Sequence, residues 1–116
     1  MSDARIIQFE ILGQDQTALQ AYYTDLFGWK LDTGNQGGYG MTDAAVTGVT
    51  VGVGATRNGS AGGVTGYITV DDIDATLARA TALGGNVVMP KFSPGPGATI
   101  ALFADPSGNV IGLTQN

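Results

Sequence analysis

The amino-acid sequence predicts an α+β domain assembled from two βαβββ half-repeats. Three observations favour this fold class. The order strand, capped helix, glycine, strand occurs twice along the chain. The sequence also matches itself when it is shifted by 57 positions. Finally, 116 residues, of which 43% are hydrophobic, suffice for one core, so we expect a single domain over residues 1–116.

The first half-repeat is expected over about residues 5–54. Asp15 can cap a helix with an apolar stripe, and Gly28 is a suitable end for that helix. Segments rich in strand-forming residues lie on both sides of the helix, with a turn near Asp43. The expected strands are residues 6–12, 29–31, 39–42 and 46–53.

The second half-repeat is expected over about residues 64–116, with the same order of elements. Asp72 is placed to cap its helix, and the pair Gly84-Gly85 is placed to end it. Residues 54–63, between the halves, are rich in small residues, which predicts a flexible linker. The expected strands are residues 67–70, 87–89, 98–104 and 109–114.

The 57-residue shift supports a duplication directly. Between residues 11 and 28 it gives seven identities without a gap, where chance would give about one. They fall on the helix cap, the apolar stripe and the helix end, which both copies need. The alternative is two unrelated βα units. The identical pairs are Ile11 and Ile68, Asp15 and Asp72, Ala18 and Ala75, Ala21 and Ala78, Thr24 and Thr81, Leu26 and Leu83, and Gly28 and Gly85.

The composition excludes several kinds of chemistry. The chain has no cysteine and no histidine, which rules out disulfides, thiolate metal sites, Ser-His-Asp triads and histidine metal ligands. The net charge is −5 and the five basic residues are scattered, which argues against nucleic-acid binding. No apolar run is long enough for a membrane helix, and residues 1–5 do not resemble a signal peptide. We therefore expect a cytoplasmic protein with no membrane partner.

Five stretches follow one another along the chain: Phe9-Glu10-Ile11, residues 21–29 (AYYTDLFGW), residues 70–75 (VDDIDA), Leu83-Gly84-Gly85 and residues 103–109 (FADPSGN). In this order they resemble the vicinal oxygen chelate superfamily, which includes glyoxalase I, bleomycin resistance proteins, extradiol dioxygenases and fosfomycin resistance proteins. The resemblance implies the glyoxalase/bleomycin resistance/dihydroxybiphenyl dioxygenase fold, in which two βαβββ units build a cup-shaped mixed sheet. It also implies a homodimer.

The metalloenzymes of this family hold their metal with four side chains inside the cup, and the resemblance maps these positions onto Gln8, Gly52, Thr65 and Gly112. Of the four, only Gln8 offers a suitable oxygen. Divalent ions in proteins are held by three or four His, Asp, Glu or Cys donors. We therefore expect no metal site and no cofactor. A register error of one residue would place valine, isoleucine or leucine there, which are no better ligands.

Alternation along the last strand of each half separates an apolar face from a face of small residues. The apolar face carries Val49, Val51, Val53, Ile111 and Leu113. Glycines such as Gly52 and Gly112 on the other face are expected to leave space in the cup, which suits an organic ligand. Relief of strand twist is the alternative role for these glycines.

Glu10 is the only glutamate of the chain and is the candidate catalytic residue. Facing a partly apolar cup, its carboxylate is suited to act as a general base or to anchor a cationic ligand. A solvated position, or an ion pair with Lys30 or Arg5, is the alternative. Tyr67 can stack on a ligand or donate a hydrogen bond to it, although a tyrosine on a half-buried strand is commonly a packing residue.

Other residues are candidates for the mouth of the cup, with packing in the core or in a dimer as the alternative. These are Trp29, Tyr39, Met41 and Phe92, together with a turn-rich loop over residues 91–97. The full set of candidate ligand-binding residues is Gln8, Glu10, Gly52, Thr65, Tyr67, Gly112, Trp29 and Phe92.

The leading functional hypothesis is metal-independent binding of a small organic molecule in the cup, such as the drug or metabolite sequestration that the resemblance to bleomycin resistance proteins implies. The alternative is a metal-independent isomerase or lyase that uses Glu10 as its base, with Tyr67 or Gln8 as the proton donor. An accessory dimer without a ligand is a third possibility. A metal-dependent glyoxalase or dioxygenase ranks last, because only Gln8 of the four mapped ligand positions offers a suitable oxygen.

Overall fold

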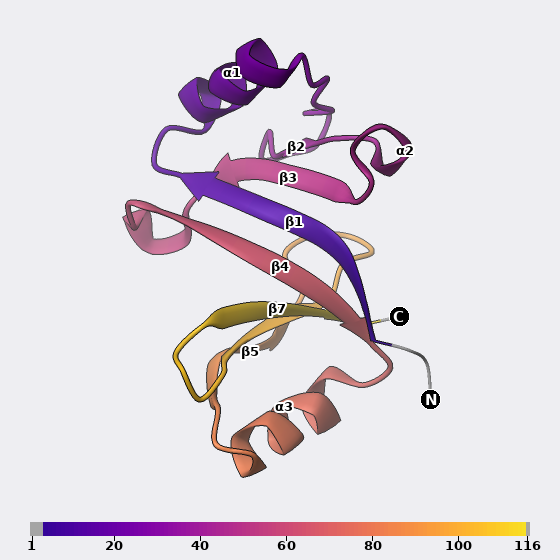
Figure 1. The fold of residues 1–116 in the computed structure, drawn as a ribbon, viewed down its shortest axis with the longest axis vertical. Helices are drawn as coiled ribbons and strands as arrows, with labels where there is room; N and C mark the ends of the chain where they lie inside the picture. Colours follow the sequence, from indigo (N-terminus) through magenta and orange to yellow (C-terminus); the bar gives the residue numbers. More distant parts are fainter. Residues whose placement is uncertain (1–3, 116) are drawn as a thin grey trace. The chain divides into compact units, whose positions relative to one another are not determined.

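The computed structural model describes residues 4–115, apart from the side chain of Asn58. The fold class is α+β, as predicted, and the chain divides into two compact units (Figure 1). One unit spans Gln8–Thr65, and the other consists of the described parts of Met1–Ile7 and Gly66–Asn116. Because this division follows the two half-repeats, each unit is described by itself.

The Gln8–Thr65 unit carries most of the first half-repeat. A parallel pairing joins its first and last strands, with Glu10 opposite Gly52, and the short β2 is antiparallel to β3. The strand order in this unit is β2-β3-β1. Its elements are β1 (Arg5–Gly13), α1 (Gln16–Phe27), β2 (Gly40–Met41), α2 (Ala44–Thr47), β3 (Thr50–Ala55) and the 3₁₀ turn η1 (Arg57–Gly59).

The second unit has the complete βαβββ order. Its first and last strands are again parallel, with Tyr67 opposite Gly112, and the remaining pairings are antiparallel. The strand order is β4-β7-β6-β5. Its elements are β4 (Gly62–Val70), α3 (Ile73–Ala82), β5 (Asn86–Phe92), β6 (Ile100–Ala104) and β7 (Val110–Gln115).

The predicted helix caps are confirmed in both units. The Asp15 side chain accepts a hydrogen bond from the backbone N–H of Ala18 at 3.0 Å, and Asp72 does the same for Ala75 at 3.1 Å. Each satisfies a donor that the first helical turn would otherwise leave without a partner. Gly28 ends α1 with a φ of 72°, a left-handed conformation that favours glycine.

Two strand predictions about the first half were wrong in detail. Residues 29–31 form no strand, and only an isolated bridge from Asp32 to Met41 remains there. The start of the predicted strand 46–53 is helical instead, because Asp43 caps α2 through the N–H of Ala45 and Gly48 ends it. The predicted flexible linker contains regular structure: β3 extends to Ala55, η1 follows, and β4 begins at Gly62.

Each unit buries an apolar cluster between its helix and one face of its strands. In the first, Ile11, Val51 and Val53 pack with α1, and burial of each such side chain contributes roughly 1.5–3 kcal/mol. In the second, the cluster consists of Ile73, Leu77, Ala101 and Leu113. The predicted apolar face of the last strands is confirmed for Val51, Val53 and Leu113. Among the described helices, none has the length and hydropathy to cross a membrane.

Candidate functional site

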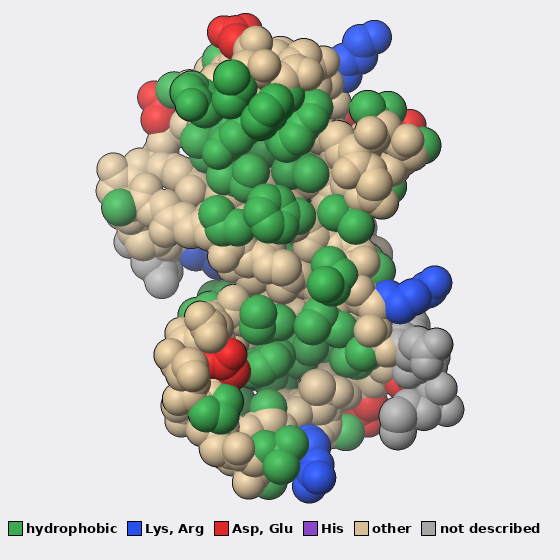
Figure 2. All heavy atoms as spheres, in the orientation of Figure 1, with side chains coloured by type: hydrophobic (Ala, Val, Ile, Leu, Met, Phe, Trp, Pro, Cys, Tyr) green, Lys and Arg blue, Asp and Glu red, His purple; other side chains and the backbone are tan. Residues whose placement is uncertain are grey.

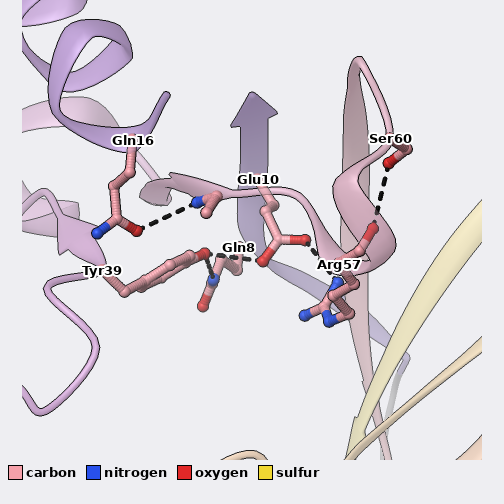
Figure 3. Close-up of polar contacts among 7 residues, drawn as sticks. Gln8, Glu10, Gln16, Tyr39, Arg57 and Ser60 are labelled. Atoms are coloured by element: carbon pink, nitrogen blue, oxygen red, sulfur yellow. Dashed lines mark hydrogen bonds and ion pairs between the residues drawn. The ribbon is translucent and has the colours of Figure 1, made fainter. Parts of the chain in front are cut away.

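The polar face of β1 carries the candidate site of the Gln8–Thr65 unit. Gln8 and Glu10 lie two residues apart, so strand alternation puts both side chains on the face opposite Ile11. Glu10 is only 4% exposed although it is charged. Tyr39 and Arg57 complete the group, and we call these four residues the Glu10 cluster (Figure 3).

Tyr39 lies over two glycines of β3. A Cβ atom built on Gly52 would overlap the Tyr39 hydroxyl, and one on Gly54 would lie 2.5 Å from Cδ1 of the ring. The tyrosine backbone is held in place by Asn35, whose side chain accepts from Tyr39 N at 3.0 Å and donates to Tyr39 O at 2.6 Å. The glycines are therefore needed to seat the ring.

A chain of hydrogen bonds runs through the Tyr39 hydroxyl. The Gln8 Nε2 donates to Tyr39 Oη at 2.7 Å, and Tyr39 Oη donates to Glu10 Oε2 at 2.9 Å. Arg57 Nη1 lies 3.7 Å from Glu10 Oε1. A carboxylate buried without such partners would cost several kcal/mol, and these contacts offset that cost.

The turn that carries Arg57 is fixed by side-chain hydrogen bonds. Ser60 Oγ donates to the carbonyl of Arg57 at 3.3 Å (Figure 3). Thr56 Oγ1 in turn donates to the carbonyl of Ser60 at 2.6 Å. Gln14, just beyond β1, donates to the carbonyl of Gly59 at 2.9 Å. The composition of residues 54–63 predicted a flexible linker because composition carries no information about these hydrogen bonds.

The prediction that the strand glycines leave open space is wrong in both units. Tyr39 occupies the space at Gly52. In the second unit the ring of Tyr67, which is 2% exposed, lies over Gly112 so closely that a Cβ there would overlap it. Tyr67 packs in an apolar cluster with Ile100 and Leu102, with Phe92 partly buried against it.

The remaining candidate residues lie apart from the Glu10 cluster or on its margins. Trp29 packs against the Ile11 cluster on the helix side, with its ring stacked on Tyr23 at 5.8 Å. Two surface hollows of about 330 and 510 Å³ flank it there. Thr65 is half-buried on β4.

The roles of Tyr39 and Arg57 beside Glu10 are not among those expected from the sequence. Tyr39 was expected only at a mouth, and Arg57 only as one of the scattered basic residues. The glycines of this unit could have indicated where the Tyr39 ring lies. Tyr39 belongs to a glycine-rich segment before β2, and the neighbouring strand β3 carries Gly52 and Gly54. An aromatic ring can lie flat on such a strand.

The side chains present do not fit the metal site of the family's metalloenzymes. Gln8 donates its amide to Tyr39, and the Tyr39 ring takes the space that a ligand at position 52 would need. Gly112 has no donor and is covered by Tyr67. Across residues 4–115, no three His, Cys, Asp or Glu side chains are grouped so that they could hold an ion.

Similarity to known proteins shows to which superfamily this chain belongs. The family model for the Glyoxalase/Bleomycin resistance protein/Dioxygenase superfamily matches residues 5–113, so the chain belongs to this superfamily. It is 36% identical over 110 residues to a provisionally named glyoxylase, CFP32, of Mycobacterium tuberculosis (strain CDC 1551 / Oshkosh) and of Mycobacterium bovis. The match covers 87% of this chain but only 41% of the relatives, so the chain spans less than half of their length.

Solved structures with the same fold are more distant in sequence. Methylmalonyl-CoA epimerase from Mycobacterium tuberculosis superposes with a TM-score of 0.68 at 17% identity, over 95% of this chain and 86% of that one. Hypothetical protein BH1468 from Bacillus halodurans C-125 gives 0.69 at 12%, over 99% and 96%. A variant of the Streptomyces coelicolor epimerase in complex with 2-nitronate-propionyl-CoA gives 0.63 at 19%, over 99% of both chains. At such identities the likeness establishes the fold alone.

Proposed function

We propose that this chain binds a small organic molecule at the Glu10 cluster, without a metal ion held at the four family ligand positions. The observation that carries the proposal is the buried Glu10 carboxylate, which is bound by the Tyr39 hydroxyl and paired with Arg57. A few convergent polar groups beside an aromatic ring are typical of a site for an organic ligand. The epimerase structure that holds a CoA ester supports the same use of this fold. Sequestration of a drug or metabolite is the simplest form of the proposal.

The test is calorimetric binding of metabolite and drug-like compounds to protein treated with a chelator. We expect a ligand for the metal-depleted protein, and we expect Gln8→Leu to weaken it about tenfold, as the loss of a hydrogen bond worth ~1.4 kcal/mol does. The matched control is Gln36→Leu, at an exposed glutamine of the same unit. Binding that needs an added metal ion, or that Gln8→Leu leaves unchanged, would contradict the proposal.

A metal-independent isomerase or lyase is the second candidate, and the hydrogen bond between Glu10 Oε2 and Tyr39 Oη favours it. A carboxylate and a phenol in contact form a base and a proton donor that can serve one reacting carbon. Tyr39 replaces the Tyr67 or Gln8 that the sequence offered as donor. In heavy water, wild-type protein should exchange a carbon-bound proton of its ligand for deuterium. Glu10→Gln should abolish this exchange and keep binding, and exchange in that variant would exclude Glu10 as the base.

The homodimer expected from the resemblance belongs to the same proposal. The α1 helix exposes apolar side chains, with Tyr22 at 60%, Leu26 at 55% and Phe27 at 58%, and hydrophobic side chains gather over this helix in Figure 2. Such a surface is typical of an interface. Sedimentation should give a dimer in wild-type protein and a monomer when Leu26 and Phe27 are both changed to serine. A monomeric wild-type protein would overturn this part. We also propose the cytoplasmic location that was expected from the sequence, and cell fractionation would test it.

A further inference from the structure

We infer that Arg57 is an anion-binding residue and that the ligand of the Glu10 cluster is a small carboxylic acid. The inference rests on the proposed function and names the ligand class for that site. It reverses the expectation that Glu10 would anchor a cationic ligand. Three properties of Arg57 carry it: its exposure relative to Glu10, the donors of its guanidinium, and the fixed turn on which it stands.

The two charges of the cluster differ in exposure. The Glu10 side chain is 5% exposed, while that of Arg57 is 34% exposed. Both oxygens of Glu10 face partners, since Oε2 accepts from Tyr39 and Oε1 lies toward Arg57. A molecule that approaches the cluster therefore meets the positive charge first, although the chain as a whole carries a net charge of −5.

The guanidinium keeps donors for a ligand. Arginine has five N–H groups in a planar fork that matches the two oxygens of a carboxylate. The contact from Nη1 to Glu10 is 3.7 Å, longer than the roughly 2.7–2.9 Å of a charge-assisted hydrogen bond. Among the described side chains, Glu10 is the one carboxylate paired with Arg57. A ligand carboxylate can thus bind the fork without displacing a strong internal bond.

The turn fixes the backbone of Arg57 before any ligand arrives. The hydrogen bonds from Thr56, Ser60 and Gln14 fix both ends of η1. Gly59 closes the turn with a φ of 68°, which a residue with a Cβ atom rarely adopts. Because the backbone is already ordered, binding does not have to order it, so more of the interaction appears as affinity. A carboxylate on Arg57 would also bring its neighbouring carbon beside Glu10 and Tyr39.

The test compares acids with their uncharged amides. We would titrate the protein with small mono- and dicarboxylates and the matching amides, and follow the side-chain NMR signals of Gln8, Tyr39 and Arg57. Acids should bind about tenfold or more tightly than their amides, and Arg57→Gln should remove this preference. Arg57→Lys should lose most of it, because lysine keeps the charge but not the fork. Arg79→Gln, at an exposed arginine of α3, is the matched control and should behave as wild type.

A double variant and the class of compound that shifts the NMR signals distinguish failure of the inference from failure of the proposed function. Because Arg57→Gln removes the cation that pairs with the buried Glu10, the double variant Glu10→Gln, Arg57→Gln repeats the comparison without that buried charge and should likewise show no acid preference. Equal binding of acids and amides, or full acid preference in Arg57→Lys and Arg57→Gln, would overturn the inference. If neutral or cationic compounds shift the Gln8 and Tyr39 signals but acids do not, the proposed site stands and the carboxylate class is wrong. If nothing shifts these signals, the proposed function fails as well.

Discussion

Both half-repeats cover a glycine of their last strand with a tyrosine ring, but they do so from different places. Glu10 and Tyr67 occupy equivalent positions, 57 residues apart, and each stands opposite a glycine, Gly52 or Gly112. In the second unit Tyr67 itself covers Gly112. In the first, the ring comes from Tyr39, in the segment before β2.

The two tyrosines therefore have different roles, since Tyr67 fills a core whereas Tyr39 binds a carboxylate. Because Tyr67 lies on the first strand of its unit, its ring fills the space and joins Ile100 and Leu102 in an apolar cluster. Because Tyr39 arrives from outside the strand, the equivalent strand position is free to carry Glu10, and the tyrosine hydroxyl binds the carboxylate. A glycine at the equivalent position of the last strand thus accompanies an apolar core in one half and a charged cluster in the other.

The largest expected effect is that of Gly112→Ala. The new methyl group would overlap the Tyr67 ring, which is almost fully buried and cannot turn away. We expect the free energy of unfolding to fall by about 2–3 kcal/mol, which is typical of overpacking in a core. Urea denaturation measures this, and a variant as stable as wild type would show that Tyr67 is not confined.

Gly52→Ala is the matched substitution in the other unit and should cost less, about 1 kcal/mol. There the overlap is with the end of the half-buried Tyr39 side chain, which can swing outward. Adding Tyr39→Ala to Gly52→Ala should cost less than the sum of the two single changes, since the overlap is then gone. If Gly52→Ala destabilises more than Gly112→Ala, the contrast between the two tyrosines is wrong.

Tyr39→Phe sharpens the chemical side of the contrast. The ring would still cover Gly52, but Glu10 Oε2 and Gln8 Nε2 would each lose a partner. The loss of a hydrogen bond to a mostly buried carboxylate costs about 1 kcal/mol. Thermal unfolding should detect this loss, whereas Tyr22→Phe, at an exposed tyrosine of α1, should stay within ~0.5 kcal/mol of wild type. Equal stability of the two variants would mean that the Tyr39 hydroxyl contributes no net bond.

The fold could be predicted from the sequence because its signals are local. Asp15 and Asp72 cap helices through donors three residues away, and the alternation of valines predicted which face of β3 packs against the helix. The errors arose where a local signal was ambiguous. A valine-rich run predicted a strand over 46–53, yet the Asp43 cap and Gly48 make a helical turn of its start.

The candidate site was predictable only in part, because its contacts are long-range. Strand alternation correctly placed Gln8 and Glu10 on one face. No spacing rule, however, indicates that Tyr39 would reach Glu10 across 29 positions or that Arg57 would lie beside it. A glycine in a strand signals that something approaches closely, but not whether that something is a ligand or a side chain of the same protein. At Gly52 and Gly112 it is a tyrosine.

The smallest expected effect concerns the aspartates before the last strand of each unit. Asp43 caps α2 through one N–H, that of Ala45, whereas Asp105 closes its turn with several donors. The Asn109 side-chain amide, followed by the backbone N–H of Asn109, lowers the pKa of Asp105 below its ordinary 3.8. A carboxylate whose pKa is lowered in the folded state stabilises the protein at pH values above its unfolded-state pKa. That contribution is lost as the pH falls through the folded-state pKa.

Asp105→Asn should therefore be slightly less stable than wild type above pH ~4, and the difference in melting temperature should close on further acidification. Asp43→Asn, which keeps a capping oxygen, is the comparison. A difference for Asp105→Asn that stays constant down to pH ~2 would mean that the turn does not depend on the ionised carboxylate.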